Sequence, residues 1–566
     1  MVDDYSPTPV EDFLDPDDPA MFPRLTPEQI DYLAEIGSQL TYARGEEVFG
    51  HGQRETPLYI VQSGAVDIID HAREGDRYFT QCQEATFIGD LSMFTGEPTL
   101  AAGYAAGPTS LIALPTEEVR RVVATAPADL GDLLLRTMIA RRDFLMGRGL
   151  GQLKLIGSRW SGEAFAVREL LERNLVPFTW HDVTTDEESR ALLDGLGIAE
   201  EDCPVLVRTE DVIRQATVTS VADELGLRAQ VDGESFEVVV LGGGPAGLAA
   251  AVYASSEGLS TLVVERFAPG GQAGTSARIE NYLGIPTGLT GSDLTRRATL
   301  QARKFGAVIS SVHEASRLSD PGSDGLREVG LADGQRVRGR SVVLAPGADY
   351  RRLPAENAER FEGLGLYYAA THIEAQQCAA EDVVVVGGGN SAGQAVVKLA
   401  ETARQVHVVA RRPLEVVMSR YLVDQIEAKS NVQVWTGCEV RSLEGDEKLE
   451  AVVISGGGPD RRIETSAVFA MIGATPRSAD LVDFVGQDDK GFVVTGEDAA
   501  RHPDVARHWT EAEEGRGPLL LECTRPGVFA IGDVRRGSTK RVASAVGDGA
   551  LVVRSIHGAL NSREAQ

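Results

Sequence analysis

Apolar runs followed directly by glycine-rich turns occur twice in the C-terminal half of the chain. The first run is FEVVV at 236–240, and the second is VVVV at 383–386. Each leads through glycines into a segment with helical character and then into another apolar run. Nearly continuous apolar strands are typical of parallel sheets that are covered on both faces. The pattern therefore predicts two α/β Rossmann-like units in this half.

The pattern is different between residues 22 and 150. A helical segment at 25–37 precedes a series of short strand-like runs that are separated by turns containing glycine. Two helical segments, at 119–127 and 128–145, close this part of the chain. Many short strands at regular spacing predict a β-barrel or jelly roll. We therefore expect an N-terminal β-barrel with accompanying helices.

Residues 151–233 alternate strand-like and helical segments. LKLIG, VPFTWHDV and PVLVR read as strands, whereas GEAFAVRELLERN, DEESRALLDGLG and VTSVADELGL read as helices. This order predicts a small α/β domain between the barrel and the Rossmann-like units. The predicted fold is thus multidomain, as the length of 566 residues also indicates.

Charge and composition exclude several classes of function. The net charge is -29 and 43% of the residues are hydrophobic. Such an acidic surface repels phosphate backbones, so we expect no nucleic-acid partner. No apolar run approaches the ~20 residues of a membrane helix. Residues 1–21 are acidic and proline-rich and read as a flexible leader rather than a secretion signal.

The five cysteines are scattered along the chain. They are Cys82, Cys203, Cys378, Cys438 and Cys523, and no C-x-x-C motif or metal-ligand cluster occurs. This usage argues against a disulfide framework and a metal site. It is typical of a reducing compartment, so we expect a cytoplasmic protein.

The first glycine-rich turn has the G-x-G-x-x-G spacing of a dinucleotide site. Gly242, Gly244 and Gly247 lie between a predicted strand and a predicted helix. This arrangement lets a pyrophosphate approach the backbone at the helix N-terminus. Glu265 ends the following strand, where a carboxylate accepts ribose hydroxyls. Together these features predict a dinucleotide site.

The second glycine-rich turn has the same spacing, but the strand that follows it ends in basic residues and not in an acid. Gly387, Gly389 and Ala392 occupy the glycine positions, and Arg411 and Arg412 stand where an acid would otherwise follow the second strand. A carboxylate repels a ribose 2′-phosphate, whereas a guanidinium pair binds it. We therefore expect this site to prefer NADPH over NADH.

Residues 235–560 resemble bacterial low-molecular-weight thioredoxin reductase. The resemblance rests on PGGQAGTSARIENYLGIP, VVLAPGADYRRLP, VFAMIGATPR and PGVFAIGDVRRGSTKRVASAVGDGALVV. It implies an FAD domain at 234–354 and 477–566, interrupted by an NADPH domain at 355–476. It also implies hydride transfer from the nicotinamide to the flavin, and it suggests a homodimer.

The resemblance assigns site residues position by position. Those implied for FAD are Gly242, Gly244, Pro245, Ala246, Gly247, Glu265, Gly271, Gln272, Asn281, Gly347, Gly532, Asp533, Arg541, Val542 and Ala543. Those implied for NADPH are Gly387, Gly389, Asn390, Ser391, Ala392, Arg411, Arg412, Ile472 and Gly473. Pro346 departs from the family, which usually has threonine there.

The redox dithiol of the resembled family is missing. Its C-x-x-C aligns with Ala369-Ala370-Thr371-His372, and neither alanine nor imidazole can form the required thiol adduct. His372 could donate a proton near the flavin or be a plain loop residue. Cys378 could act as a lone thiol or be a small packed side chain. Both are candidate catalytic residues on this reasoning.

The N-terminal modules resemble two further families. Residues 22–150 are similar to a cyclic-nucleotide-binding domain, although the family's Gly-Glu pair is Gly89-Asp90 and its Pro-Arg is Pro98-Thr99. Loss of the guanidinium removes a bidentate phosphate contact. We therefore expect domain contact or another small ligand in preference to a cyclic nucleotide. Residues 151–233 resemble a glutaredoxin or thioredoxin, with Cys203-Pro204 at that family's cis-proline and no dithiol.

Three functions are compatible with these observations. The first is an NADPH-dependent FAD oxidoreductase that passes electrons to an unknown acceptor other than a disulfide, such as a quinone or a flavodoxin. The second is a thioredoxin-disulfide reductase that uses other thiols, Cys378 among them. The third is a redox or nucleotide sensor with low turnover, in which the flavin module reports its state to the N-terminal domains.

Overall fold

The computed structural model describes most of the chain. The described residues are 8–9, 15–53, 56–72, 75–89, 93, 99, 101–126, 128–148, 153–174, 176–208, 211–276, 278–368, 370, 378, 380–446, 448–456, 458–481, 484–509 and 516–564. The chain divides into two compact units, one of residues 1–228 with 303–306 and the other of 229–302 with 307–566.

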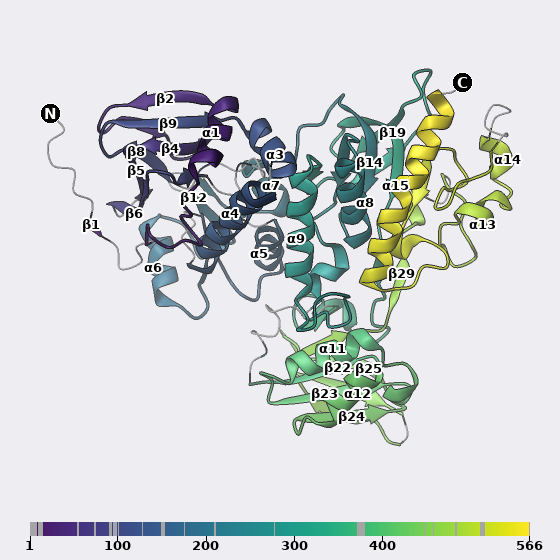
Figure 1. Ribbon diagram of the computed structural model, residues 1–566. Coiled ribbons are helices and arrows are strands. Elements are labelled where there is room, and N and C mark those ends of the chain that lie inside the picture. The colour runs from purple at the N-terminus through teal and green to yellow at the C-terminus, as the bar shows by residue number, and fades with distance from the viewer. Residues whose placement is uncertain are drawn as a thin grey trace. The chain divides into compact units, whose positions relative to one another are not determined.

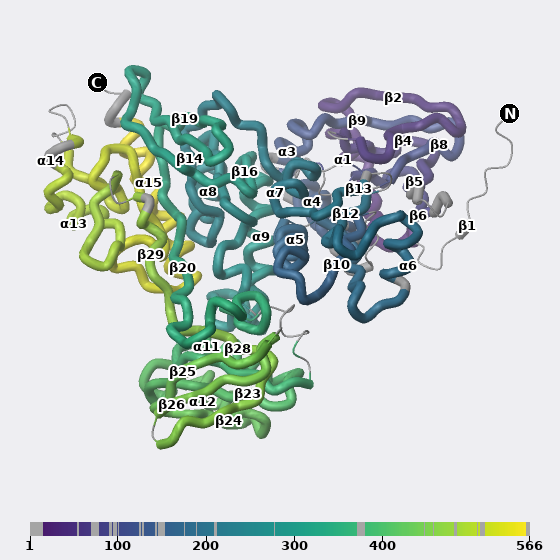
Figure 2. The backbone as a smooth tube through the Cα atoms, turned by 180° about the vertical axis from the view of Figure 1, so that it is seen from behind, coloured from purple at the N-terminus to yellow at the C-terminus, as the bar shows by residue number. Residues whose placement is uncertain are grey.

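The first unit begins with a barrel made from two sheets, which can be followed in Figures 1 and 2. One sheet has the order β1-β6-β5-β8-β3 and the other β2-β9-β4-β7. Phe49, Tyr59, Val61 and Leu111 from both sheets pack into one apolar core. The strands are β1 (Thr8–Pro9), β2 (Ser38–Tyr42), β3 (Glu47–Phe49), β4 (Leu58–Ser63), β5 (Ala65–Ala72), β6 (Gly75–Gln83), β7 (Phe87–Ile88), β8 (Ala102–Ala105) and β9 (Thr109–Leu114).

Three helices in the described part of this region accompany the barrel, as the sequence predicts. Helix α1 (Pro27–Ile36) starts at a capping box in which Thr26 Oγ1 accepts from the backbone N–H of Gln29. Helices α3 (Thr116–Thr125) and α4 (Ala128–Arg148) follow β9. The predicted β-barrel with helices is therefore present in the first unit.

A four-stranded mixed sheet completes the first unit. Its order is β11-β10-β12-β13, with β10 parallel to β11 and antiparallel to β12. The Cys203–Pro204 peptide bond is cis and directly precedes β12. The elements are β10 (Leu153–Gly157), α5 (Gly162–Arg173), β11 (Thr179–Asp182), α6 (Glu187–Gly195), β12 (Val205–Arg208), β13 (Asp211–Ile213) and α7 (Val218–Glu224).

The second unit contains a seven-stranded sheet with a parallel core. Its order is β16-β15-β14-β19-β18-β17, and β30 pairs with β19. Helix α8 packs against the C-terminal helix α15, as Figure 1 shows. The elements are β14 (Ser235–Leu241), α8 (Pro245–Ser256), β15 (Thr261–Val264), α9 (Gly291–Lys304), β16 (Val308–Ser310), β17 (Ala315–Leu318), β18 (Arg327–Leu331), β19 (Arg336–Leu344), β30 (Val528–Ala530) and α15 (Val542–Glu564).

A second parallel sheet is inserted between β19 and β30 in the sequence. It has the order β21-β28-β22-β23-β24, and a three-stranded antiparallel sheet β25-β26-β27 accompanies it. The chain enters and leaves through β20 (Ala348–Tyr350) and β29 (Ala474–Pro476), which pair antiparallel. The other elements are β21 (Leu366–Tyr367), β22 (Asp382–Val386), α11 (Asn390–Leu399), β23 (Gln405–Ala410), α12 (Arg420–Glu427), β24 (Val432–Thr436), β25 (Glu439–Glu444), β26 (Ala451–Ser455), β27 (Arg461–Glu464) and β28 (Ala467–Ala470).

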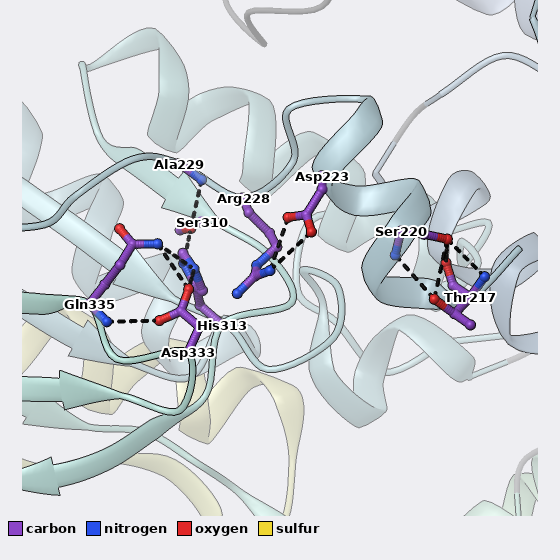
Figure 3. Close-up of polar contacts among 9 residues, drawn as sticks. All are labelled: Thr217, Ser220, Asp223, Arg228, Ala229, Ser310, His313, Asp333 and Gln335. Carbon is purple, nitrogen blue, oxygen red and sulfur yellow. Dashed lines mark hydrogen bonds and ion pairs between the residues drawn. The ribbon is translucent and has the colours of Figure 1, made fainter. Parts of the chain in front are cut away.

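A polar network fixes the segment that enters the second unit, as Figure 3 shows. The backbone N–H of Ala229 donates to Ser310 Oγ at 2.9 Å, and Ser310 Oγ lies 2.6 Å from His313 Nδ1. His313 Nε2 lies 2.9 Å from Asp333 Oδ2, which also accepts from Gln335 at 2.9 Å. Because the Asp333 carboxylate can only accept, Nε2–H of His313 donates to it, and in the neutral imidazole Nδ1 then accepts from the Ser310 hydroxyl. The network therefore ties the entry segment to the sheet.

Two features are absent from the described residues. No helix there has both the length and the apolar composition needed to cross a membrane. No cluster of at least three histidine, cysteine or acidic side chains that could hold a metal ion is found in the same part of the chain.

Candidate dinucleotide sites

The turn between β14 and α8 requires glycine at two positions. Gly242 has φ +113°, and a Cβ there would overlap the carbonyl oxygen of Ala345. A Cβ at Gly247 would overlap the carbonyl oxygen of Gly242, so helix and turn are in direct backbone contact. Side chains at either position are excluded on steric grounds. The fingerprint glycines thus bring the helix N-terminus up to the end of the strand.

The N-terminus of α8 has the properties of an anion site. Gly244 is the N-cap residue, and no side chain caps the helix. Gly271 approaches Gly244 so closely that a Cβ on Gly271 would lie 2.9 Å from the Gly244 Cα. Uncapped N–H groups and the helix dipole favour a phosphate at this point. The donor set therefore fits the pyrophosphate of a dinucleotide.

Glu265 joins the end of β15 to this turn. Its Oε2 accepts from the backbone N–H of Gly243 at 2.6 Å, and its Oε1 accepts from the N–H of Phe267 at 3.1 Å. The residue is only 7% exposed. These two bonds fix the carboxylate while leaving acceptor lone pairs for the hydroxyls of a ribose. The geometry suits the role that the sequence predicts for Glu265.

Four of the other predicted FAD residues come from three separate segments of the second unit. Gln272 Nε2 donates to the carbonyl oxygen of Ala348, which joins the loop after β15 to the crossing strand β20. Gly347, in that crossing, has φ +75°. Gly532 has φ +72°, and a Cβ there would lie 2.9 Å from Ala246. Asn281 is solvent-exposed.

The segment PGVFAIGDVRRGSTKRVASAVGDGALVV, residues 526–553, combines the carboxyl group of Asp533 with the ammonium group of Lys540. Burial raises the pKa of Asp533, and Asp548 raises it further, whereas Lys540 lowers it. Burial lowers the pKa of Lys540, whose Nζ donates to the carbonyl oxygen of Asp533. Lys540 also lies over the ring of Phe492, 4.5 Å from the centroid. The predicted residues Arg541, Val542 and Ala543 follow directly, at the start of α15.

Asp548 is part of this arrangement, although the sequence motifs alone do not point to it. It lies on α15 and accepts from the backbone N–H of Gly532 at 3.0 Å. It also pairs with Arg535 at 3.1 Å. In the sequence, the signal that could have pointed to Asp548 is its position between two glycines in the last helix. Asp548 fixes the loop that carries Asp533.

The second turn, between β22 and α11, repeats the first. Gly387 has φ +139°, and a Cβ there would overlap the carbonyl oxygen of Met471. Gly389 is the N-cap residue of α11, with no side-chain cap and open space at its Cβ position. Asn390 does not cap the helix but accepts from the backbone N–H of Ser419 at 2.7 Å. Ser391 and Ala392 form the first turn of α11.

The arginine pair lies at the same sheet edge as this turn. Val386 pairs with Val409 in the parallel ladder, and Arg411 and Arg412 follow two and three residues after Val409. Both side chains are exposed, and neither has an ion pair among the described residues. Cations at this place fit a ribose 2′-phosphate. Gly473 lies at the crossing next to Ile472, and its carbonyl oxygen accepts from Arg351 N–H.

Of the two candidate catalytic residues, His372 and Cys378, the structure describes only Cys378. His372 lies outside the described residues, as do Ala369 and Thr371. Cys378 is 5% exposed and belongs to an apolar cluster that includes Ala370 and Val383. This placement agrees with the alternative that Cys378 is a small packed side chain ahead of β22.

Two sheets with parallel cores, each presenting an uncapped helix N-terminus behind a glycine turn, define a flavoprotein oxidoreductase with one site for each of two dinucleotides. The sequence model described as pyridine nucleotide-disulphide oxidoreductase matches residues 236–549, and the chain belongs to this family. It is an FAD-dependent oxidoreductase of the thioredoxin reductase type, as the sequence predicts. FAD and NADPH are the cofactors of that type.

Individual relatives agree with this assignment. Thioredoxin reductase of Mycoplasmopsis pulmonis is 29% identical over 321 residues, covering 56% of this chain and 94% of the relative. Thioredoxin reductase of Bacillus subtilis is 30% identical over 329 residues, covering 57% of this chain and 93% of the relative. The crystal structure of T. acidophilum thioredoxin reductase is 26% identical, with a TM-score of 0.50, and the match covers 57% of this chain and 98% of that one.

The N-terminal barrel also matches a known family. The model described as cyclic nucleotide-binding domain matches residues 39–126. The expected fusion of such a domain to a thioredoxin reductase-like module is therefore confirmed. Asp90 and Pro98, two of the positions discussed for ligand binding, lie outside the described residues, whereas Gly89 and Thr99 are described.

Proposed function

We propose that the protein is an NADPH-dependent FAD oxidoreductase that passes electrons to an acceptor other than a disulfide. The observation that carries the proposal is the placement of its thiols. Cys378, Cys438 and Cys523 are the cysteines of the second unit, and all three are buried. Electron transfer from the flavin through a pair of thiols requires a thiolate that both the flavin and a partner disulfide can reach.

Each of these thiols has a packing role instead. Cys523 is fully buried in the apolar core around β30, where burial raises its pKa well above the usual value. Cys438 Sγ donates to backbone carbonyl oxygens of Thr436 and Gly456, at 3.7 and 3.5 Å. Cys378 lies in the core of the inserted sheet. A buried neutral thiol is a poor nucleophile.

The residues predicted to bind the two dinucleotides support electron transfer from NADPH to the flavin. When bound, FAD accepts a hydride from the nicotinamide and passes the electrons on. Glu265 and the N-terminus of α8 would hold the FAD, with Asp533 near its ribityl chain. Arg411 and Arg412 would hold the 2′-phosphate and select NADPH over NADH.

The division into domains is part of the same proposal. We assign 22–150 to the cyclic-nucleotide-binding type, 151–233 to a thioredoxin-like domain, 234–354 with 477–566 to FAD, and 355–476 to NADPH. The antiparallel pair of β20 and β29 supports the last two assignments, because it marks the chain crossings into and out of the inserted sheet.

The test uses the purified full-length protein with FAD bound. NADPH is added together with either menadione or oxidised thioredoxin, and NADPH oxidation is followed by absorbance. The proposal expects turnover with the quinone and none above background with thioredoxin, both in the wild type and in Cys378→Ser. Thioredoxin reduction that is lost in Cys378→Ser would contradict it and favour a thiol-dependent reductase.

A further inference from the structure

The N-terminal barrel contains a cavity whose wall is almost entirely apolar. It is partly open to solvent, and its volume is about 140 Å³. Aromatic and aliphatic side chains dominate the lining, among them Phe22, Phe49, Tyr59, Phe79, Ile68 and Ile88. An apolar cavity of roughly 150 Å³ is large enough to hold a benzene molecule. The barrel therefore offers a site for a ligand about the size of one substituted ring.

Thr99 stands where the cyclic-nucleotide-binding family has an arginine, and its hydroxyl is already hydrogen-bonded within the protein. Thr99 Oγ1 donates to the carbonyl oxygen of Gly50 at 2.7 Å and accepts from the backbone N–H of Gln53 at 3.0 Å. It closes the loop after β3 and carries no charge. A buried phosphate needs charged donors to offset the loss of its hydration. Thr99 cannot supply them.

Arg141 is the cationic side chain among the described residues of the cavity wall, and its position is fixed by the barrel. It is 8% exposed and donates to the carbonyl oxygens of Met21, Gly89 and Phe87 at 2.8, 2.7 and 3.0 Å. Its guanidinium carbon lies 4.5 and 5.0 Å from the ring centroids of Phe87 and Phe22. These contacts fasten α4 to the barrel. Arg141 thus acts as a structural cross-link in the wall.

One lining residue, Thr56, carries a polar atom that has no partner among the described residues. Thr56 Oγ1 is buried, and it has no hydrogen bond among the described residues. A buried hydroxyl without a partner is unfavourable unless a ligand or water completes it. Nearby, burial raises the pKa of Cys82 to about 11, which keeps this wall residue neutral. Among the described lining residues, the cavity therefore combines a largely apolar surface with one cation, Arg141, whose donors are taken up by backbone carbonyl oxygens, and with one hydroxyl that has no partner.

We propose that the barrel binds a small, uncharged, largely apolar ring compound with one hydroxyl or carbonyl group, and not a cyclic nucleotide. The ring fills the apolar cavity, and the polar group pairs with Thr56 Oγ1. This ligand chemistry differs from that of the family to which the barrel belongs. It is independent of the acceptor proposed for the flavin module.

The first experiment is calorimetry on the full-length, oxidised, FAD-loaded protein with three probes. p-Cresol and toluene differ by one hydroxyl, and cyclic AMP represents the family's ligand class. We expect p-cresol to bind, toluene to bind about 3- to 10-fold more weakly because one hydrogen bond is lost, and cyclic AMP to give no binding heat. Tighter binding of cyclic AMP than of p-cresol would overturn the proposal.

Two variants locate the site. Ala101→Leu fills the cavity and is expected to abolish p-cresol binding, whereas Ala106→Leu, the same change outside the cavity, is expected to retain it. Thr56→Val removes an unpartnered hydroxyl without changing its shape, so we expect a folded protein that binds p-cresol and toluene equally. Circular dichroism and flavin absorbance check folding. Unchanged p-cresol binding in folded Ala101→Leu, or an unchanged preference in Thr56→Val, would overturn the proposal.

Discussion

Oε2 of Glu265 accepts a hydrogen bond from the backbone N–H of Gly243 at 2.6 Å. The acid that follows β15 is thereby tied to the turn that begins α8. One residue thus couples the place proposed for the ribose to the place proposed for the pyrophosphate, and a change there should affect both.

Glu265→Ala is expected to weaken FAD binding about 10- to 100-fold, because charge-assisted hydrogen bonds contribute about 1.5–3 kcal/mol. The measurement is the ratio of flavin absorbance to protein after purification, followed by titration of the stripped protein with FAD. Glu257→Ala is the matched control, since Glu257 caps the far end of α8 and is exposed. Equal FAD affinity in the two variants would contradict the role of Glu265.

Gly242→Ala should abolish FAD binding, because the new Cβ overlaps the carbonyl oxygen of Ala345 at a positive φ. Gly258→Ala is the control that has the positive φ without the steric overlap. Gly258 has φ +88° but open space around its Cβ position. We expect this control to keep its FAD and to lose only about 1 kcal/mol of stability. Flavin content and thermal unfolding measure the two effects. FAD retention in Gly242→Ala would show that the turn is not the dinucleotide site.

Replacing Arg411 and Arg412 together by alanine should raise the KM for NADPH at least 10-fold and leave that for NADH unchanged. The reason is that the guanidinium pair contacts only the 2′-phosphate, which NADH lacks. Arg404→Ala removes another exposed arginine of the same domain, one that pairs with Asp382, and serves as the control. A parallel change in both KM values would indicate general damage to the site instead.

Native thiol reactivity should not respond to NADPH. Cys203 is half-buried and the other four cysteines are buried, so a disulfide reagent should titrate about one thiol in the native protein. Burial and the neighbouring Glu200 and Asp202 raise the pKa of Cys203. Less thiolate is then present at neutral pH, and the reaction should accelerate as the pH rises. Cys203→Ser should remove this reaction.

Additional thiols that appear after anaerobic addition of NADPH would contradict the prediction, because they would reveal a disulfide that the reduced flavin opens. Titration of the unfolded protein, which exposes all five cysteines, calibrates the count.

Much of the fold follows from local pattern. Gly242 and Gly387 could be recognised because the glycine spacing and the flanking apolar runs are both encoded within about 30 residues. The ladder that pairs Val386 with Val409 then places Arg411 at the predicted edge. Parallel sheets make this inference reliable, since successive strand ends meet at one edge.

Other features depend on contacts between distant segments. Arg141 bonds to Met21, Phe87 and Gly89, which lie 120, 54 and 52 residues away in sequence. No periodicity in α4 signals those partners. Asp548 likewise supports Gly532 from the last helix, and its role emerges only when the loop is folded against that helix. The sequence motif identified neither residue because their partners are not local.

The central claim is that electrons can enter the flavin from NADPH although no thiol pair receives them. Anaerobic titration of the FAD-loaded protein with NADPH, followed by flavin absorbance, tests it most directly. A flavin takes up two electrons, so the account predicts complete bleaching at about one NADPH per flavin. A requirement for about two NADPH per flavin would reveal a reducible disulfide beside the flavin and would contradict the account, as would a flavin that NADPH does not bleach.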